Sequence, residues 1–282
     1  VEAVANTDWQ RDPLLALQSR WALANVQFHR GHWRAALTGF EVCLRHYRSA
    51  GHRRSAVQDP AVMCLGYSSW ILFELGRADE ALDRIERMLS HARALEHPFS
   101  LAVALSFAAS IKRLCGDTES AVGHADEAVA VCERGQFEVW LAHAWMVRGQ
   151  LLADHGMVQA GAVDMDRGYA LWTGGGARIS CATYLITRAE ILLRGGEADA
   201  AGLLLAQAGA ISRVIGEYYY HAELRRLRGL SAWQQGDLAA AGRQLRHALR
   251  LAQRHAKPGL ALRCALSLGA WHARHGEHAQ AT

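Results

Sequence analysis

The sequence predicts an all-α fold, a right-handed α-solenoid of about seven helix hairpins with a 40-residue period, the last hairpin truncated. Three observations predict it. Glycines that follow apolar, helix-like segments recur with spacings of 45, 40, 40, 40, 40 and 40 residues. Small residues hold fixed positions on both sides of each glycine. All four prolines stand where a hairpin is expected to begin, a position that proline tolerates.

The recurring glycines are expected to form the turn inside each hairpin, because glycine adopts the left-handed conformation that stops a helix. Acidic residues follow several of them, at Asp117, Glu197, Asp237 and Glu277, where the next helix dipole favours negative charge. The five extra residues of the first interval predict a longer loop or helix extension around Gly51–Arg54. The turn glycines are Gly31, Gly76, Gly116, Gly156, Gly196, Gly236 and Gly276.

Small residues occur seven positions before and five positions after each glycine, so they fall on both helices of a hairpin. They allow the two helices to approach closely, and larger apolar residues nine positions after the glycine fill the gaps beside them. The positions before the glycine hold Ala24, Ser69, Ala109, Gly149, Ala189, Gly229 and Gly269. The positions after it hold Ala36, Ala81, Ala121, Gly161, Ala201, Ala241 and Ala281.

The repeat occupies the whole chain, which predicts a single helical repeat domain over residues 1–282. Pro13, Pro60, Pro98 and Pro258 are expected to open first helices of hairpins. The chain lacks an initial Met and ends within the pattern, so we expect it to be a piece of a longer polypeptide. The expected repeats are roughly 12–51, 59–97, 98–136, 137–176, 177–216, 217–257 and 258–282.

This arrangement resembles the tetratricopeptide repeat, whose period is 34 residues. The match runs from seven residues before each glycine to twelve after it. The six extra residues of the present period are therefore expected to lengthen the second helix or its connection to the next hairpin.

Composition excludes several classes of function. The formal charge is +4, from 31 basic and 27 acidic residues, and this even balance predicts no nucleic-acid partner. The apolar stretch Leu101–Ile111 stops at Lys112, so no membrane span is expected. The six cysteines form no C-x-x-C pair and are typical of buried side chains in a reducing, cytoplasmic compartment.

No motif in the sequence indicates catalysis, a metal site or a cofactor. The glycine triplet 174–176 lacks the lysine and the preceding strand of a phosphate loop, and we expect a connection between hairpins there. His272, His275 and His278, and likewise His29 and His32, are expected to be solvated residues at helix ends, not metal ligands. No nucleophile elbow or pair of convergent carboxylates is present. The sequence therefore predicts that the chain is not an enzyme.

Three arginines stand in register, eight residues before their turn glycines: Arg148, Arg188 and Arg228. They could form an anion-binding ladder. Alternatively, this position faces the packing between helices, where each arginine pairs with a neighbouring carboxylate. We favour the second interpretation, because the position packs in ordinary tetratricopeptide geometry.

Several stretches resemble the C-terminal region of a bacterial signalling family. They are residues 59–67 (DPAVMCLGY), 75–82 (LGRADEAL), 97–102 (HPFSLA), 216–224 (GEYYYHAEL) and 226–229 (RLRG). Members of this family carry a class III nucleotide cyclase or winged-helix domain, then an AAA/STAND-type ATPase, then a C-terminal tetratricopeptide array. The resemblance runs from about Tyr47 to Gly276 and concerns the array alone, since neither the cyclase aspartates nor a phosphate loop is present.

First helices of such hairpins line the concave face of the array. Positions ten, six and three before each turn glycine form one stripe at helical spacing. We predict a partner- or ligand-binding surface there, aromatic in the first two repeats and polar in the middle ones. Alternatively, the N-terminal aromatic residues face an ATPase-side domain of the parent protein. The candidate residues are Trp21, Asn25, Phe28, Trp70, Phe73, Arg113, Gln150, Glu190, Arg226 and Trp233.

These observations favour a non-catalytic interaction or sensor module of a larger bacterial regulatory protein. It would bind a protein, a peptide, a domain of its own parent chain or a small effector, and relay that state to an upstream ATPase. One alternative is a scaffold or homodimer that associates through the truncated C-terminal end, where Leu266, Leu268 and Trp271 would expose an apolar face. A remote alternative is a helical-toroid enzyme, which would need convergent acids or histidines.

Overall fold

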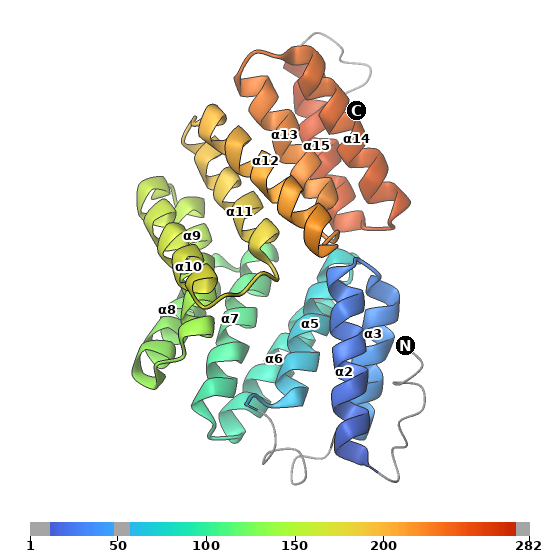
Figure 1. The fold of residues 1–282 in the computed structure, drawn as a ribbon, viewed down its shortest axis with the longest axis vertical. Coiled ribbons are helices and arrows are strands. Elements are labelled where there is room, and N and C mark those ends of the chain that lie inside the picture. The colour runs from blue at the N-terminus through green and yellow to red at the C-terminus, as the bar shows by residue number, and fades with distance from the viewer. Residues whose placement is uncertain (1–11, 48–56, 275–282) are drawn as a thin grey trace. The chain divides into compact units, whose positions relative to one another are not determined.

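The structure, a computed structural model, describes residues 12–47 and 57–274. These residues form thirteen α-helices, which follow one another as hairpins (Figure 1). The predicted all-α fold of sequential helix hairpins is thereby confirmed. The pairs are α2 (Pro13–His29) with α3 (Trp33–His46), α5 (Pro60–Glu74) with α6 (Ala78–Ala94), α7 (Pro98–Leu114) with α8 (Thr118–Gly135), α9 (Glu138–Asp154) with α10 (Val158–Gly174), α11 (Cys181–Arg194) with α12 (Ala198–Ile215), and α13 (His221–Gln234) with α14 (Leu238–Arg254), before α15 (Pro258–Arg274).

The described residues divide into two compact units. The first comprises residues 12–47, 57–73 and 77–147, and the second comprises residues 74–76 and 148–274. Within the second unit, the first helix α13 contacts both α11 and α15, and α12 and α14 each pack against the helices that precede and follow them. The single-domain assignment over residues 1–282 stays a prediction.

The turn glycines have the left-handed backbone that the sequence predicts. Their φ angles are +81° at Gly31, +78° at Gly76, +85° at Gly116, +81° at Gly156, +80° at Gly196 and +85° at Gly236. The seventh turn and the longer connection around residues 51–54 lie outside the described residues. These turns end each first helix within two residues of the glycine, as glycine at a helix C-terminus does.

Helix starts also agree with the sequence. Pro13, Pro60, Pro98 and Pro258 are the first residues of α2, α5, α7 and α15. Two of the predicted acidic residues are N-caps with side-chain hydrogen bonds. Asp117 accepts from the amide of Ser120 at 3.3 Å, and Asp237 accepts from the amide of Ala240 at 2.8 Å. Glu197 occupies the N-cap of α12 without such a bond. The caps satisfy amides that have no partner inside the helix.

The small residues bring paired helices into close contact, as predicted. The small residues that flank the six described turns are all buried. The fourth hairpin is the tightest case. A Cβ atom added to Gly149 of α9 would lie 2.6 Å from the carbonyl oxygen of Gly161 on α10 and 3.1 Å from the amide nitrogen of Met165. Backbone therefore meets backbone here, and only glycine fits.

In the first unit, the carboxylate of Asp59 connects two consecutive repeats. One carboxylate oxygen caps α5 by accepting from the amides of Ala61 (2.9 Å) and Val62 (3.1 Å). The hydroxyl of Tyr47 donates to the other oxygen, and His91 of α6 lies 3.1 Å from the first. Burial alone would raise the pKa of Asp59, but hydrogen bonds from His91 and Tyr47 outweigh it and lower this pKa. The carboxylate therefore stays ionised and holds the repeats together.

The cysteines are free thiols in the structure, and all but Cys115 are buried. Burial raises the pKa of Cys132 and of Cys264 to about 12, so both thiols stay protonated and unreactive.

Within the described residues, one helix, α12, has a length and an apolar composition that would allow it to cross a membrane. In the structure its Ala201, Leu205 and Ala208 are buried in a core shared with α11 and α13.

Candidate functional site

The candidate residues lie at the positions ten, six and three before each turn glycine, along one side of each first helix. We name this side of a first helix the first-helix face and describe it separately for each unit. In the first unit, Trp21 and Asn25 of α2 and Trp70 and Phe73 of α5 are half-buried. Phe28 differs from the prediction. It is 3% exposed and packs among the rings of Trp33 and Tyr67, so it belongs to the core.

Three of these residues carry donors without an acceptor. Trp21 Nε1, Asn25 Nδ2 and Trp70 Nε1 are buried atoms with no hydrogen-bond partner among the described residues. Elsewhere the chain does satisfy such a group: Trp172 Nε1 donates to the carbonyl oxygen of Ile179 at 2.9 Å. An unsatisfied buried donor is unfavourable by about 1–3 kcal/mol, and three of them lie on the candidate stripe of α2 and α5.

In the second unit, the structure brings together two predicted residues, Glu190 of α11 and Arg226 of α13. Arg226 Nη2 lies 3.2 Å from Glu190 Oε1. The same guanidinium donates to Glu223, from Nη2 at 2.6 Å and from Nε at 3.0 Å, and to Ser267 Oγ of α15 at 3.2 Å. Arg263 of α15 adds a longer contact of 3.9 Å to Glu223. We call these five residues the charge network; it joins three first helices.

Glu223 raises the pKa of both arginines of the charge network. Burial alone would lower the pKa of Arg226, but the charge and the hydrogen bonds of Glu223 outweigh it and raise this pKa. The charge of Glu223 likewise raises the pKa of Arg263. Sequence reasoning missed Glu223, Arg263 and Ser267. The signal that could have found Glu223 is its position three residues before Arg226, a spacing that favours ion pairs on a helix.

The remaining candidates do not join this network. Arg113 of α7 and Gln150 of α9 are half-buried. Trp233 of α13 packs beside the small core that contains Leu245 and Trp271, and the guanidinium carbon of Arg274 lies 5.4 Å from the centre of its ring. Their proposed role in binding stays a prediction.

The three arginines that stand in register pack against neighbouring helices, as the favoured interpretation predicts, but one of them does not pair with a carboxylate. Arg148 Nε donates to Asp164 at 2.6 Å, and Arg188 makes two hydrogen bonds to Asp166, of 2.6 and 2.9 Å. Arg228 Nη2 donates instead to the carbonyl oxygen of Leu205 at 2.8 Å. No anion ladder is therefore formed, because each guanidinium turns towards a different group on a second helix.

Three expectations about residues near helix ends are corrected. Trp271 is 8% exposed, because it packs on α14 beside Leu245 and Ala241, whereas Leu266 is 65% exposed as expected and Leu268 is half-buried. His272 and His29 are buried instead of solvated. Gly174 is the last residue of α10, and Gly175 and Gly176 begin the predicted connection to α11. No group of three or more potential metal ligands occurs within residues 12–47 and 57–274.

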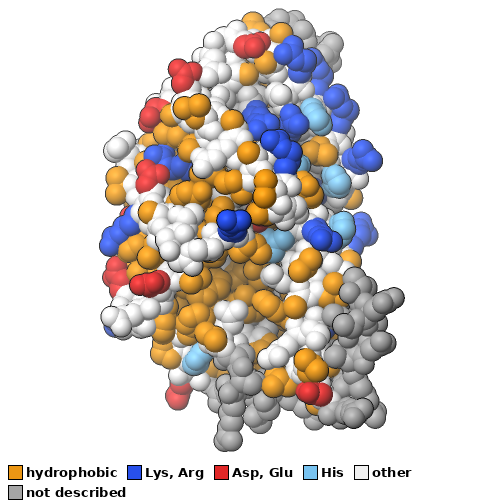
Figure 2. All heavy atoms as spheres, viewed as in Figure 1, with side chains coloured by type: hydrophobic (Ala, Val, Ile, Leu, Met, Phe, Trp, Pro, Cys, Tyr) orange, Lys and Arg blue, Asp and Glu red, His pale blue; other side chains and the backbone are white. Residues whose placement is uncertain are grey.

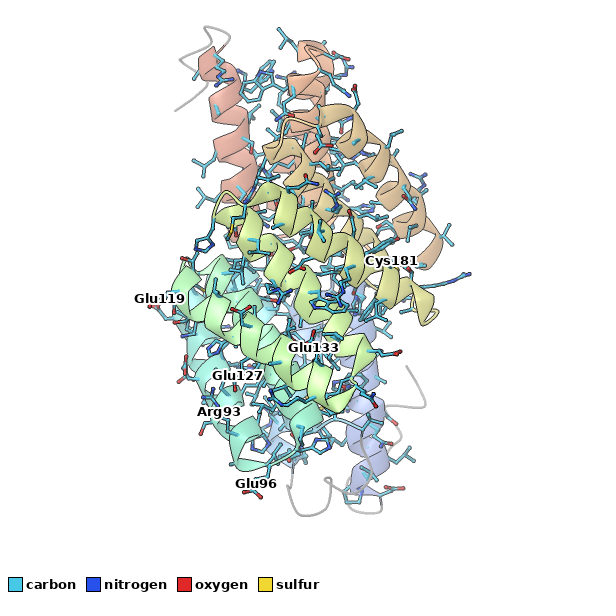
Figure 3. The ribbon with its side chains drawn as sticks, turned by 90° about the vertical axis from the view of Figure 1, so that its left-hand side faces the viewer. Arg93, Glu96, Glu119, Glu127, Glu133 and Cys181 are labelled. Carbon is cyan, nitrogen blue, oxygen red and sulfur yellow. The ribbon has the colours of Figure 1, made fainter. Side chains whose placement is uncertain are left out.

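A pocket of about 400 Å³ lies in the first unit, where the end of α6 meets α7 and the end of α8 meets α9. Its apolar lining includes Leu101, Val131 and Phe137. Arg93 and Arg134 also line it. Arg93 makes a 3.4 Å ion pair with Glu127 of α8 (Figure 3). For Arg134 the described part of the chain provides no ion pair. Glu96 and His97 complete the polar lining.

Comparison with known proteins gives a likeness in fold. No protein-family model and no curated protein matches the sequence. A Rap protein complexed with competence and sporulation factor matches over 99% of this chain and 74% of its own, with a TM-score of 0.73 and 12% identity. The Rap conjugation gene regulator of plasmid pLS20, in complex with a Phr peptide, matches over 100% and 75%, with a TM-score of 0.72 and 10% identity.

A third similar structure is a STAND signal-transduction ATPase with a tetratricopeptide repeat sensor, from Pyrococcus horikoshii. It matches over 94% of this chain and 40% of its own, with a TM-score of 0.52 and 12% identity. At such identities the likeness concerns the fold alone. The chain therefore has the tetratricopeptide-like helical repeat fold that it shares with the Rap regulators and with this sensor.

Proposed function

We propose that the chain is a binding and sensor module that holds a peptide segment on its first-helix face. The observation that carries this proposal is the set of unsatisfied donors on Trp21, Asn25 and Trp70. A peptide offers a carbonyl acceptor at every residue. Binding it would satisfy the donors, while the half-buried rings of Trp21, Trp70 and Phe73 contribute apolar area.

The charge network supplies a second kind of anchor on the same class of helices. Glu190 and Arg263 are its partly exposed members, while Glu223 and Arg226 are buried beneath them. Because the buried pair fixes the geometry of the other two, Glu190 and Arg263 can meet a charged ligand group without further ordering.

The solved structures support the proposal at the level of the fold. Two Rap structures contain a bound factor or peptide, and the tetratricopeptide repeats of the STAND ATPase are described as a sensor. We extend the proposal accordingly: the chain works in the cytoplasm, and its occupied state is relayed to an ATPase of its parent protein.

The test uses peptides selected from a displayed random library against the chain, with affinity measured by fluorescence anisotropy. Trp70→Phe removes the unsatisfied N–H and keeps an aromatic ring. We expect it to weaken binding about five- to tenfold, the value of one hydrogen bond, without loss of thermal stability. The matched control is Trp172→Phe, which removes a satisfied donor; it should lower stability and leave peptide affinity unchanged.

Two results would contradict the proposal: no peptide can be selected, or Trp70→Phe and Trp172→Phe have equal effects on affinity. The same peptides also distinguish the two proposed anchors, the aromatic stripe and the charge network. If Glu190→Gln alone weakens binding, the charge network is the anchor and the aromatic stripe is not.

A small effector is the second candidate, because the pocket beside Arg134 combines an apolar lining with a guanidinium that has no ion pair in the described part of the chain. Such a site fits a small molecule with an apolar body and one carboxylate. We expect octanoate to raise the melting temperature of the chain, octanol to raise it less, and Arg134→Gln to abolish the difference. The control is Arg87→Gln, an exposed residue of α6 outside the pocket. Equal shifts in both variants would exclude this site.

A further inference from the structure

The small net charge of the chain conceals a strong separation of charge. Residues 198–282 contain 11 Lys and Arg but five Asp and Glu, whereas residues 1–197 contain 20 and 22. The C-terminal part is therefore strongly basic and the rest is slightly acidic. The expectation drawn from the total charge could not detect this, because the two parts nearly cancel.

Much of the basic charge lies on one side of α14. The helix carries four arginines, one histidine and no acidic residue. At 3.6 residues per turn these five side chains fall within an arc of about 100°, and all five are exposed. Figure 2 shows Lys and Arg side chains gathered over the part of the surface that α13 and α14 occupy in Figure 1. We call this arc the basic face; its residues are Arg243, Arg246, His247, Arg250 and Arg254.

The basic face is not neutralised by the residues that the structure describes. None of its arginines makes an ion pair with a carboxylate of the described residues. Arg246 instead makes a cation–π contact: its guanidinium carbon lies 5.7 Å from the centre of the Trp271 ring. By contrast, Arg148, Arg188 and Arg194 in the same unit each pair with an aspartate. Stability therefore does not explain this arrangement, because unpaired like charges on one surface repel each other.

Neighbouring helices add to the positive field. Arg225 of α13 donates to Gln244 of α14 at 3.2 Å, which places its charge beside the basic face. Burial and then the charges of Arg225 and Arg250 lower the pKa of His247. Burial and then Arg225 and Arg228 lower the pKa of His221 to about 4. These histidines are kept neutral at physiological pH, so the guanidinium groups alone supply the charge.

We infer that the basic face of α14 docks an acidic helical segment of a partner protein. The four arginines follow one another at separations of three, four and four residues, which correspond to rises of about 4.5, 6 and 6 Å. Carboxylates on a second helix with the same spacing meet each guanidinium in turn. This surface belongs to a second helix of a hairpin, so it is separate from the first-helix face, and the inference does not depend on the proposed function.

Two other polyanions fit the basic face less well. Single-stranded nucleic acid is held by basic residues together with aromatic side chains on which bases stack, and the arc contains no aromatic residue. A membrane surface is held by a basic face together with apolar side chains that insert, and the only apolar residue in the arc is Ala239. An acidic protein helix requires neither stacking nor insertion.

The test uses a labelled peptide of about 15 residues with glutamates at the matching positions, a scrambled peptide of equal charge, duplex DNA and phosphatidylserine vesicles. We expect the wild-type chain to bind the patterned peptide, and the Arg246→Gln/Arg250→Gln variant to bind it about tenfold more weakly. The control variant Arg77→Gln/Arg87→Gln removes equal charge from two exposed sites, the N-cap of α6 and α6 itself, and should bind within about twofold of wild type. Circular dichroism confirms that both variants are folded.

Three outcomes would overturn the inference. The first is an absence of peptide binding by the wild type. The second is an equal loss of affinity in the two double variants, which would mean that total charge alone matters. The third is tighter binding of DNA or vesicles than of the patterned peptide, or equally tight binding of the scrambled and the patterned peptides. Either result would assign the basic face to a different polyanion.

Discussion

Replacement of Arg226 by Met is expected to lower the free energy of unfolding of the second unit by about 3 kcal/mol. The exchange keeps an unbranched side chain of similar length but removes the guanidinium that binds Glu223. Glu223 is 2% exposed and Arg226 is 8% exposed, so the carboxylate would remain buried after losing both hydrogen bonds from Arg226. Removal of one partner from a buried ion pair is among the most destabilising changes in a protein. Urea denaturation followed by circular dichroism measures the loss.

The double variant Glu223→Leu/Arg226→Met separates the pair from its surroundings. Because it removes both charges, it should recover most of the lost stability. The matched surface control is Arg188→Met, whose partner Asp166 is exposed; here a loss below about 1 kcal/mol is expected. If Arg226→Met and Arg188→Met cost the same, the charge network is no more than a surface ion pair.

Gly149→Ala is expected to lower the free energy of unfolding of the fourth hairpin by about 2 kcal/mol, although alanine favours helices. The added methyl group would lie 2.6 Å from the carbonyl oxygen of Gly161. That oxygen belongs to the backbone of α10 and cannot move aside as a side chain does. The two helices must therefore separate and lose contacts along the hairpin. Hydrogen exchange of α9 and α10 amides measures the loss locally.

Gly123→Ala is the matched control, because a Cβ atom there meets nothing within 4 Å. In this variant helix propensity acts alone, and stability should rise by about 0.5–1 kcal/mol. Opposite signs in the two variants would show that close packing sets the cost. A gain in stability for Gly149→Ala would show that α9 and α10 are more loosely packed than the structure has them.

The repeat could be predicted from the sequence because its determinants are local. A left-handed glycine, a proline at a helix start and small residues at fixed distances act within one hairpin. Gly31 and Gly236 show the same turn although they stand at opposite ends of the array. The tight contact of Gly149 and Gly161 follows from the same pattern, since both are the smallest residues at the two closest positions.

The candidate site could be predicted only in part, because helical spacing gives a direction and not the neighbours found there. Phe28 occupies the predicted stripe, yet Tyr67 of the next repeat covers it. Trp271 was expected to be exposed, but the preceding helix α14 buries it. In both cases the side chain that decides exposure comes from another hairpin.

The sequence by itself determined a repeat array of helix hairpins, the residues at its turns and the helix face that carries polar and aromatic side chains. The tertiary structure decided which of those side chains meet. Arg226 reaches Glu190, 36 residues before it, and Ser267, 41 residues after it, so the charge network exists only when three repeats are stacked. It likewise decided that the arginines of α14 have no ion pair among residues 12–47 and 57–274. The physical reason is the range of the interactions: turns and helices depend on neighbours along the chain, whereas ion pairs and burial depend on neighbours one repeat away.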